Sequence, residues 1–445
     1  MVPSSPSFLA PADLRHNRLH PADRAFHDWY RFILSYPPHL VRDYLQQFAL
    51  DASAVVLDPF CGTGTTLVEA KKQGLTAVGV EAVPMAHFAC ATKTQWAVDI
   101  AALETMVGRT LERTAEWMVA APLRTFAPAQ QTLVMRNAIN PLPLHKCLVL
   151  GDAIAVEPPG PERDILNLAL AYVAVQDASN LRFGPEVGLR RKRREDAPVL
   201  ASWQVKVAQM AADITAWSHC AGVRTHCHRG DARTLRSLLE PNSIDAIITS
   251  PPYPNEKDYT RTTRLESVLL GYLKNKQDLR AFKETLIRSN SRNVYRLDDD
   301  DQVLSRQSQI RRLARTIEAK RIALGKTSGF ECKYHRVTTL YFGGIKRHLL
   351  DLQGALRPGA QLAYVVGDQA SFFQILIRTG ELLAEIAEEA GYQVKGIDLF
   401  RTRGASATGT QLREEVVRLE WHGVVKQSRS FVLPHSKFSK GGAIK

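Results

Sequence analysis

The 445-residue sequence lacks any run of about twenty apolar residues, the length that a helix needs to cross a bilayer. The segment Met1–Leu19 mixes Pro, Ser, Arg and His and has no apolar core of the kind found in a signal peptide. Cysteine is scarce, with six residues and no Cys-x-x-Cys pair, which disfavours a disulfide framework. These absences predict a protein of the reducing cytoplasm with no membrane segment.

Metal-ligand patterns are also missing from the sequence. The nearest approach to one is His219-Cys220 followed by His226-Cys227-His228. Their spacing fits no standard zinc finger, and adjacent residues of a strand point to opposite faces. We therefore expect no metal.

Acidic residues are outnumbered by basic ones. The chain has 58 Lys and Arg against 45 Asp and Glu, a formal net charge of +13. This excess suits a polyanionic partner, because each phosphate that Lys or Arg neutralises releases counterions. A solvated basic surface with no partner is the alternative. The apolar fraction of 45% is ordinary for a globular protein, and the length allows two or three folding units.

Two short strings carry the chemistry, and each follows an apolar run that predicts a buried strand. The first is residues 57–66, Leu-Asp-Pro-Phe-Cys-Gly-Thr-Gly-Thr-Thr, at the end of the strand 54–57. Its glycines let the backbone approach a ligand, and the helix that follows presents free N–H groups. A Walker loop requires Lys where Thr65 stands, and a dinucleotide fingerprint requires glycine where Leu67 stands. The string therefore has the form of a loop for another nucleoside cofactor.

The second string is Ser250-Pro251-Pro252-Tyr253, after the predicted strand 244–248. An exocyclic amine on a base is a poor nucleophile because its lone pair is delocalised, so catalysis needs acceptors that hold both amine hydrogens. The Ser250 hydroxyl and a backbone carbonyl between the prolines can supply them, preorganised because proline fixes φ. Tyr253 offers a ring face on which a flipped base can stack. A plain turn after a strand is the alternative interpretation.

The two strings together resemble the S-adenosylmethionine-dependent methyltransferases that modify exocyclic amines of DNA bases, and Ser-Pro-Pro-Tyr resembles the cytosine-N4 branch. The resemblance implies an α/β, Rossmann-like methyltransferase fold with a mixed, mostly parallel seven-stranded sheet, here with a largely helical insertion. It implies S-adenosylmethionine as the cofactor, and an enzyme that methylates the N4 amine of a cytosine flipped out of double-stranded DNA. Candidate protein partners are a cognate restriction endonuclease or another component of a defence system.

The resemblance also implies which residues hold the cofactor. Glu81 ends the next strand, where a carboxylate accepts hydrogen bonds from both ribose hydroxyls. Asp231 is assigned to the adenine amino group, with Asp152, in the same Gly-Asp-Ala context, as a rival. The aromatic stretch around Tyr30 resembles a motif that closes over the cofactor, and its side chains could equally be core. The predicted cofactor-binding residues are Tyr30, Asp58, Phe60, Gly62, Gly64, Thr65, Thr66, Glu81 and Asp231.

Basic side chains predict where nucleic acid binds. Arg261 and Arg264 follow the second string closely and could touch the strand that holds the flipped base. A compact basic run lies farther upstream, with a solvated surface as its alternative interpretation. The predicted nucleic-acid-binding residues are Arg190, Arg191, Lys192, Arg193, Arg194, Arg261 and Arg264.

The resemblance covers about 26–98, 223–272 and 336–422, and two other stretches separate these parts. The insertion is a candidate for target recognition. The predicted segments are 1–98, the N-terminal segment with the first half of the methyltransferase domain; 99–222, the helical insertion; 223–272, with the catalytic loop; 273–335, variable and basic; 336–422, the remainder of the methyltransferase domain; and 423–445, a tail.

Three alternatives stay open. A tRNA guanine-N2 methyltransferase has a very similar glycine loop, but usually Asp-Pro-Pro-Tyr and a separate N-terminal RNA-binding domain. A DNA adenine-N6 methyltransferase normally has Asp or Asn in place of Ser250. A regulator that binds cofactor and DNA without modifying the DNA would not need an intact Ser250–Tyr253. Methylation at carbon-5 of cytosine is disfavoured, because it uses a Cys nucleophile in a Pro-Cys setting that the sequence lacks.

Overall fold

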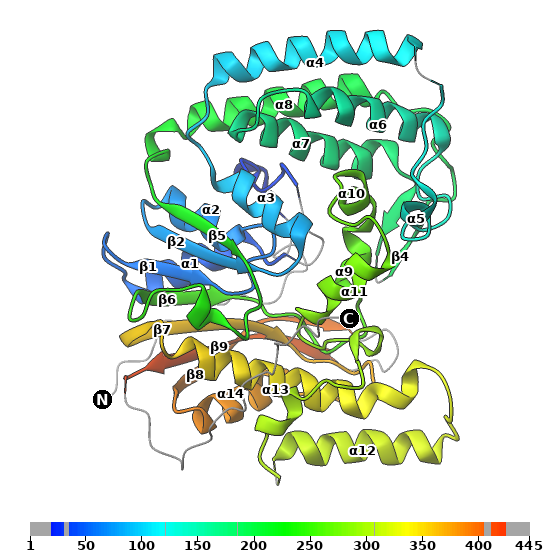
Figure 1. The fold of residues 1–445 in the computed structure, drawn as a ribbon. Helices are drawn as coiled ribbons and strands as arrows, with labels where there is room; N and C mark the ends of the chain where they lie inside the picture. The colour runs from blue at the N-terminus through cyan, green and yellow to red at the C-terminus, as the bar shows by residue number, and fades with distance from the viewer. Residues whose placement is uncertain are drawn as a thin grey trace, which may run out of the picture.

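The computed structural model describes residues 19–30, 35–120, 122–184, 186–306, 308–404 and 411–423. Its centre is a seven-stranded sheet with the order β5-β2-β1-β6-β7-β9-β8 (Figure 1). The pairs from β5 to β7 are parallel, whereas β9 runs antiparallel to both β7 and β8. This topology confirms the predicted mixed, mostly parallel sheet of a Rossmann-like methyltransferase. The strands are β1 Val55–Asp58, β2 Thr76–Glu81, β5 Thr225–Arg229, β6 Ile244–Thr249, β7 Leu356–Gly367, β8 Gln393–Gly404 and β9 Gln411–Trp421.

The sheet is the middle of three layers, because successive side chains of a strand point to opposite faces. Val56 of β1 packs in one apolar cluster with α1, α2 and α3, whereas its neighbour Leu57 packs in another with α12, α13 and α14. The helices of the first face are α1 Pro38–Phe48, α2 Thr65–Lys72 and α3 Pro84–Thr94. Those of the second are α12 Gln309–Ala323, α13 Tyr334–Leu352 and α14 Thr379–Glu389.

Helices α4 to α8 form the insertion, which stacks at one end of the sheet (Figure 1). Its core is continuous with the rest of the chain: Trp203 and Leu168 share one apolar cluster with Met85 of α3 and with Phe26. The insertion is therefore packed onto the methyltransferase part along a broad interface. Its elements are α4 Ile100–Ala120, α5 Pro128–Gln131, α6 Pro141–Ala155, α7 Pro161–Val173 with the π-helical turn Ala174–Ala178, the antiparallel hairpin β3 Leu181–Phe183 and β4 Val187–Leu189, and α8 Val199–Ala216.

The stretch after β6 braces the loop that carries Ser-Pro-Pro-Tyr. The amide of Asn290 donates to the carbonyl of Lys257 at 3.1 Å, and the backbone N–H of Ser291 donates to the Glu256 carboxylate at 2.8 Å. The predicted variable segment thus contributes fixed contacts to the fold. Its helices and those just before it are α9 Tyr259–Thr262, α10 Arg264–Leu269 and α11 Lys276–Glu284.

The apolar pattern of residues 372–390 predicts a helix over the whole stretch, but the observed helix is shorter. Phe373 and Gln374 have φ of 53° and 61°, a left-handed conformation that cannot continue an α-helix, so α14 starts only at Thr379. The predicted tail after residue 423 lies outside the described residues. Within the described part of the chain, no helix is long and apolar enough to cross a membrane.

Candidate active site

A cavity of about 550 Å³ lies at the carboxyl ends of the parallel strands, where ligands bind in open α/β sheets. The loop after β1 and the loop after β6 both line it, so the two sequence strings face one space. Most of the predicted cofactor and catalytic residues lie in its wall: Phe60, Gly62, Thr65, Glu81, Asp231, Ser250, Pro251, Pro252 and Tyr253.

Asp58 lies behind this wall rather than in it. Its fully buried carboxylate accepts hydrogen bonds from the hydroxyls of Tyr36 at 2.7 Å and Thr249 at 2.6 Å. Burial raises the pKa of Asp58 to about 6. Thr66 is also buried and donates to the carbonyl of Ile248 at 2.9 Å. The two side chains, predicted to bind the cofactor directly, instead hold the first loop against the end of β6, and Gly64 likewise does not line the cavity.

Glu81 fixes the glycine loop from the end of β2. Its carboxylate accepts from the backbone N–H of Gly62 at 2.8 Å and of Val83 at 2.7 Å. Burial raises the pKa of Glu81 to about 7. Each oxygen uses one lone pair on a backbone donor and keeps another for a ligand, because an ionised carboxylate has about four acceptor sites.

Asp231 lies in the cavity wall and Asp152 does not. Arg233 approaches Asp231 with two nitrogens, Nε at 3.0 Å and Nη2 at 2.6 Å, and also bonds Asp300 at 2.6 Å. Asp152 is exposed on α6, where it pairs with Arg124. The geometry therefore favours Asp231 over its rival as the acidic group near the cofactor.

Tyr30 is placed away from the cavity, although the sequence pattern suggested that it closes over the cofactor. Its buried hydroxyl donates to Glu266, and its ring packs in the apolar cluster of the insertion. Tyr36, from the same aromatic stretch, lines the cavity instead. Sequence alone could not choose between the two tyrosines, because which one faces the cavity depends on the distant residues that each contacts.

Hydrogen bonds to neighbouring residues fix the loop that carries Ser250 and Tyr253. The Ser250 hydroxyl donates to the carbonyl of Val365 on β7 at 3.1 Å. While its one proton is on this carbonyl, the Ser250 hydroxyl presents lone pairs to a ligand. The backbone N–H of Tyr253 donates to the Tyr259 hydroxyl at 3.0 Å, and a Cβ on Gly367 would lie 3.1 Å from the Tyr253 ring. Ser250 and Tyr253 are thus held by fixed neighbours.

Charged residues that the sequence did not single out complete the cavity wall. Arg401 pairs with Glu414, and Nη2 of Arg403 donates to the carbonyl of Asp368 at 2.8 Å. Lys257 lies beside them. Arg401 and Arg403 alternate on β8, so they share one face of that strand. The alternation of these two arginines is visible in the sequence. Their place at the cavity depends on the antiparallel pairing of β8 with β9, which the sequence does not show.

The comparison with known proteins agrees with this site. Residues 15–87, which contain the glycine loop and Glu81, match the sequence model of a DNA methylase family, N6_N4_Mtase. The type II methyltransferase M.BsoBI of Geobacillus stearothermophilus is 22% identical over 430 residues, 86% of this chain and 82% of that protein. The type II methyltransferase M.AvaI of Anabaena variabilis is 24% identical over 409 residues, 84% of this chain and 80% of that protein. In sequence the chain is thus similar to DNA N6/N4 methylases.

Solved structures align less closely. TrmN from Thermus thermophilus aligns with 89% of this chain and 52% of its own, at 11% identity and a TM-score of 0.30.

S-adenosylmethionine is the cofactor of the N6/N4 methylase family and of this fold, and the residues present fit it. The cavity volume of about 550 Å³ lies within the range of roughly 300–1,000 Å³ usual for small-molecule sites. Glu81 has acceptor capacity left for hydroxyl donors such as those of a ribose. Gly62, at φ 52° with open space around its Cβ position, keeps the loop clear for a ligand.

The predicted DNA-contacting cations fall into two groups in this methylase relative. Arg190 Nε donates to the carbonyl of Leu181 at 3.1 Å, and Arg194 Nη1 donates to the carbonyl of Ser179 at 3.3 Å. Arg264 Nε donates to the carbonyl of Thr260 at 3.0 Å. These three arginines stabilise the fold. Arg191, Lys192 and Arg193 are exposed and form no side-chain hydrogen bond or ion pair with the described residues, and Arg261 is held 3.6 Å from Glu186.

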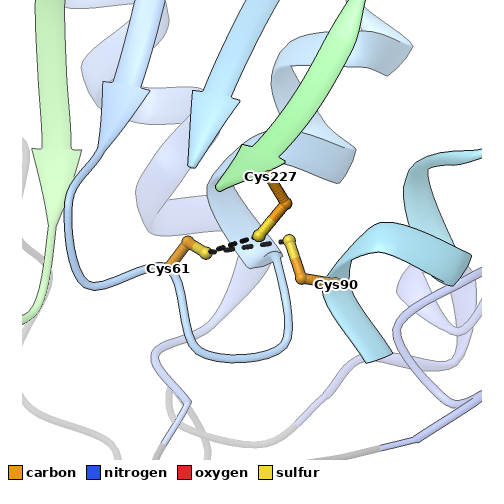
Figure 2. Close-up of side chains that lie close together, drawn as sticks. All are labelled: Cys61, Cys90 and Cys227. Atoms are coloured by element: carbon orange, nitrogen blue, oxygen red, sulfur yellow. Dashed lines mark hydrogen bonds between the residues drawn. The ribbon is translucent and has the colours of Figure 1, made fainter. Parts of the chain in front are cut away.

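Three cysteines that are far apart in the sequence meet behind the glycine loop (Figure 2). Cys61 Sγ lies 3.7 Å from Cys90 Sγ on α3 and 3.6 Å from Cys227 Sγ on β5. No fourth His, Cys, Asp or Glu joins this group among the described residues, so a closed four-ligand zinc site is not complete here. The sulfurs pack the loop onto the sheet, a contact that the linear spacing of the cysteines did not indicate.

Proposed function

We propose that this chain is a type II DNA methyltransferase that transfers the methyl group of S-adenosylmethionine to the exocyclic N4 amine of cytosine. The single observation that carries the proposal is the shared cavity, whose wall contains both the glycine loop with Glu81 and the Ser-Pro-Pro-Tyr loop. The relationship to M.BsoBI and M.AvaI, both type II methyltransferases, supports the reaction class.

The state of Ser250 supports an amine as the acceptor group. With its proton on the carbonyl of Val365, the Ser250 hydroxyl is oriented to accept a hydrogen bond from an amine N–H. A backbone carbonyl of the two prolines can take the second N–H. Holding both hydrogens turns the nitrogen lone pair away from conjugation with the ring and toward the cofactor, which supplies a methyl group on a positively charged sulfur. In such a direct transfer the bond from nitrogen to the methyl carbon would form as the bond from sulfur breaks, S-adenosylhomocysteine would leave, and the methylated nitrogen would release one of its two protons to solvent; no covalent enzyme intermediate is needed.

Tyr253 supports a base as the ring that carries this amine. Its ring lines the cavity and is backed by Gly367 and Glu414, so it offers a fixed face for stacking. A base can reach this depth only after it leaves the duplex, at a cost of a few kcal/mol. The proposal of cytosine rather than adenine rests on serine as the first residue of the Ser-Pro-Pro-Tyr motif. The basic charge of +13 suits DNA as the substrate, with a cognate restriction endonuclease as a candidate partner in the cell.

The deciding experiment is methyl transfer from labelled S-adenosylmethionine to unmethylated DNA and, in parallel, to tRNA, followed by mass spectrometry of the nucleosides. We expect N4-methylcytosine in DNA. N6-methyladenine in DNA would overturn the base assignment, and label found only in tRNA as N2-methylguanosine would overturn DNA as the substrate.

Variants of the catalytic loop test the roles of its residues. Ser250→Ala should lower kcat by about 100- to 1,000-fold, the range typical for loss of one preorganised polar group, while binding of S-adenosylhomocysteine survives. Ser243→Ala is the matched control: Ser243 lies just before the other end of the same strand and donates to the carbonyl of Glu240. Loss of cofactor binding in Ser250→Ala would contradict the proposal that the glycine loop binds the cofactor and the Ser-Pro-Pro-Tyr loop binds the acceptor base.

A further inference from the structure

A second, much smaller cavity lies behind the glycine loop. Its volume is about 20 Å³, enough for one water molecule or one oxygen of a ligand. It shares Ser35, Tyr36, Pro37 and Thr65 with the wall of the large cavity, so the two spaces are neighbours. A group that extends from the large cavity past Thr65 would enter it.

Lys93, near the end of α3, lines this small cavity. The side chain is 1% exposed, yet its ammonium has no hydrogen-bond partner among the described residues. Lys71 shows the contrast, because this buried lysine donates to the carbonyls of Ala221 and Val223. A buried charge without a hydrogen-bond partner is costly, and no carboxylate of the described residues forms an ion pair with Lys93. Asp28 acts on the ammonium without pairing with it.

The face of α3 that carries Lys93 looks toward the glycine loop. Cys90 lies three residues earlier, on the same side of the helix, and Figure 2 shows it beside Cys61 of that loop. A Cβ on Gly64 would come within 2.8 Å of Cys90 Sγ, so helix and loop touch. Lys93 is therefore next to the point where the loop passes into α2.

The negative charge of Asp28 favours the protonated form of Lys93, but the Asp28 carboxylate also lies 4.0 Å from the ammonium of Lys206. The carboxylate beside the cavity-lining His27 belongs to Glu69 and is paired as well. Glu69 is buried and pairs with His27 at 2.7 Å, Arg42 at 2.7 Å and Lys72 at 3.2 Å. Burial lowers the pKa of His27 to about 4, so this ring is neutral at physiological pH. Burial also lowers the pKa of Lys93, to about 8, which leaves most of it protonated near pH 7. The small cavity therefore retains positive charge.

The start of α2 adds further donors to the same place. Its N-cap, Gly64, provides no side-chain hydrogen bond, so the first N–H groups of the helix are free for a ligand. Helix N-termini favour anions. The hydroxyl-bearing residues Thr63 and Thr65 line the small cavity together with Lys93. Ammonium, hydroxyls and helix end together form an environment for a carboxylate.

We propose that the α-carboxylate of the methionine portion of S-adenosylmethionine places one of its oxygens in the small cavity and that Lys93 is its counter-ion. The inference rests on the proposed function, which places this cofactor in the large cavity. The carboxylate is the only anionic group of that molecule, and Lys93 lies where the large cavity continues behind the loop. Lys93 thus determines which nucleosides are bound tightly: those with an amino-acid tail.

The test compares two ligands that differ in this tail. S-adenosylhomocysteine has the carboxylate, and 5′-deoxy-5′-methylthioadenosine lacks the amino-acid portion. Calorimetric titration of the full chain carrying Lys93→Met should show about a 10- to 100-fold weaker affinity for S-adenosylhomocysteine, as expected for the loss of a charge-assisted hydrogen bond, and an unchanged affinity for methylthioadenosine. The unliganded variant should melt no earlier than the wild type, because it has lost an unpaired buried charge.

Lys71→Met is the matched control. It removes a buried lysine from α2 and should lower the melting temperature, because two backbone carbonyls lose their donor. The ratio of the two ligand affinities should not change. This pattern separates a role in binding the tail from a general role of buried lysines in stability.

Three results would decide against the inference or its basis. An equal loss of affinity for both ligands in Lys93→Met, or no loss for either, would overturn the role of Lys93. Wild-type protein that binds neither ligand would instead overturn the cofactor assignment, and the inference with it. Selective loss of S-adenosylhomocysteine binding supports the inference even if no methyl group reaches cytosine, in which case only the proposed acceptor is wrong.

Discussion

Thr249 donates a 2.6 Å hydrogen bond from its hydroxyl to the buried carboxylate of Asp58. Thr249 ends β6, directly before Ser250, and Asp58 ends β1, directly before the glycine loop. The Tyr36 hydroxyl donates to the same carboxylate at 2.7 Å. One carboxyl group therefore sets the position of the cofactor loop, the catalytic loop and the N-terminal segment relative to one another.

Loss of this link should affect both stability and catalysis. Thr249→Val keeps the shape of the side chain and removes its hydroxyl, and the net cost of one hydrogen bond is about 1 kcal/mol. We expect the free energy of unfolding, measured with urea, to fall by that amount. We also expect a lower kcat, because Ser250 would no longer be held in line with the cofactor loop. Thr105→Val on α4, whose exposed hydroxyl donates to Ala101, is the control and should change neither quantity. A normal kcat in Thr249→Val would show that the link serves stability alone.

Glu81 predicts a pH dependence whose sign follows from its environment. Burial raises its pKa from 4.5 to about 7, so between these values the folded protein holds a proton that the unfolded chain has released. The contribution of Glu81 to the free energy of unfolding therefore falls as pH rises from 4.5 to 7 and is constant above. Glu81→Gln should remove this part of the slope, measured by urea unfolding at a series of pH values.

The same group should control the affinity for the cofactor in the opposite direction. Ionised Glu81 can accept from hydroxyl donors with both oxygens, so the affinity for S-adenosylhomocysteine should rise as pH rises toward 7, a range in which Lys93 stays protonated. In Glu81→Gln the affinity should be low and independent of pH over this range. A variant that keeps the wild-type pH profile would exclude Glu81 as the titrating group.

Both the backbone conformation at position 64 and the lack of space beside it require glycine there. Its φ is 87°, and an added Cβ would lie 2.8 Å from Cys90 Sγ. Gly64→Ala should weaken cofactor binding, because the loop must move away from α3. The double variant Gly64→Ala with Cys90→Ala removes the clash but keeps the unfavourable φ, so titration should show partial recovery. No recovery would assign the whole effect to φ.

Gly367 supports the catalytic loop in a similar way. An added Cβ would lie 3.1 Å from Cε2 of Tyr253 and 3.2 Å from Cγ of Glu414. Gly367→Ala should displace the Tyr253 ring and lower kcat, with cofactor affinity unchanged. Gly108→Ala on α4 is the control, because nothing lies within 4 Å of its Cβ position; it should stabilise the helix by up to about 1 kcal/mol.

The sequence predicted well those features that depend on short-range order. The strands before the two loops, the glycine loop and Ser-Pro-Pro-Tyr are contiguous, so their residue types alone define them. Contacts between residues that are far apart in the sequence could not be predicted from such local patterns. The choice of Tyr36 over Tyr30, the meeting of Cys61 with Cys90 and Cys227, and the place of Lys93 all depend on which faces of distant elements come together.

The basic run shows the same limit at the level of single residues. The five cations are consecutive and look alike in the sequence. In the structure, however, Arg190 and Arg194 bond backbone carbonyls near their own hairpin, and only the three between them form no bond with the described residues. Composition indicated a basic surface. It could not assign which side chains are available to a partner.

These three cations give the last prediction. Alanine at Arg191, Lys192 and Arg193 should weaken DNA binding at low salt and reduce the dependence of log K on log salt concentration by about 0.9 for each phosphate that the variant no longer neutralises. The fold should be unaffected because none of the three is buried.

The control variant has alanine at Arg315 and Lys320, which are exposed on α12 on the other side of the sheet (Figure 1). It removes charge without changing the insertion and should leave the slope unchanged. An unchanged slope in the triple variant with a reduced slope in the α12 variant would assign the DNA backbone to the opposite side of the molecule. Because the salt slope reports how many phosphates the protein neutralises, it distinguishes these surfaces even when methylation itself is unaffected.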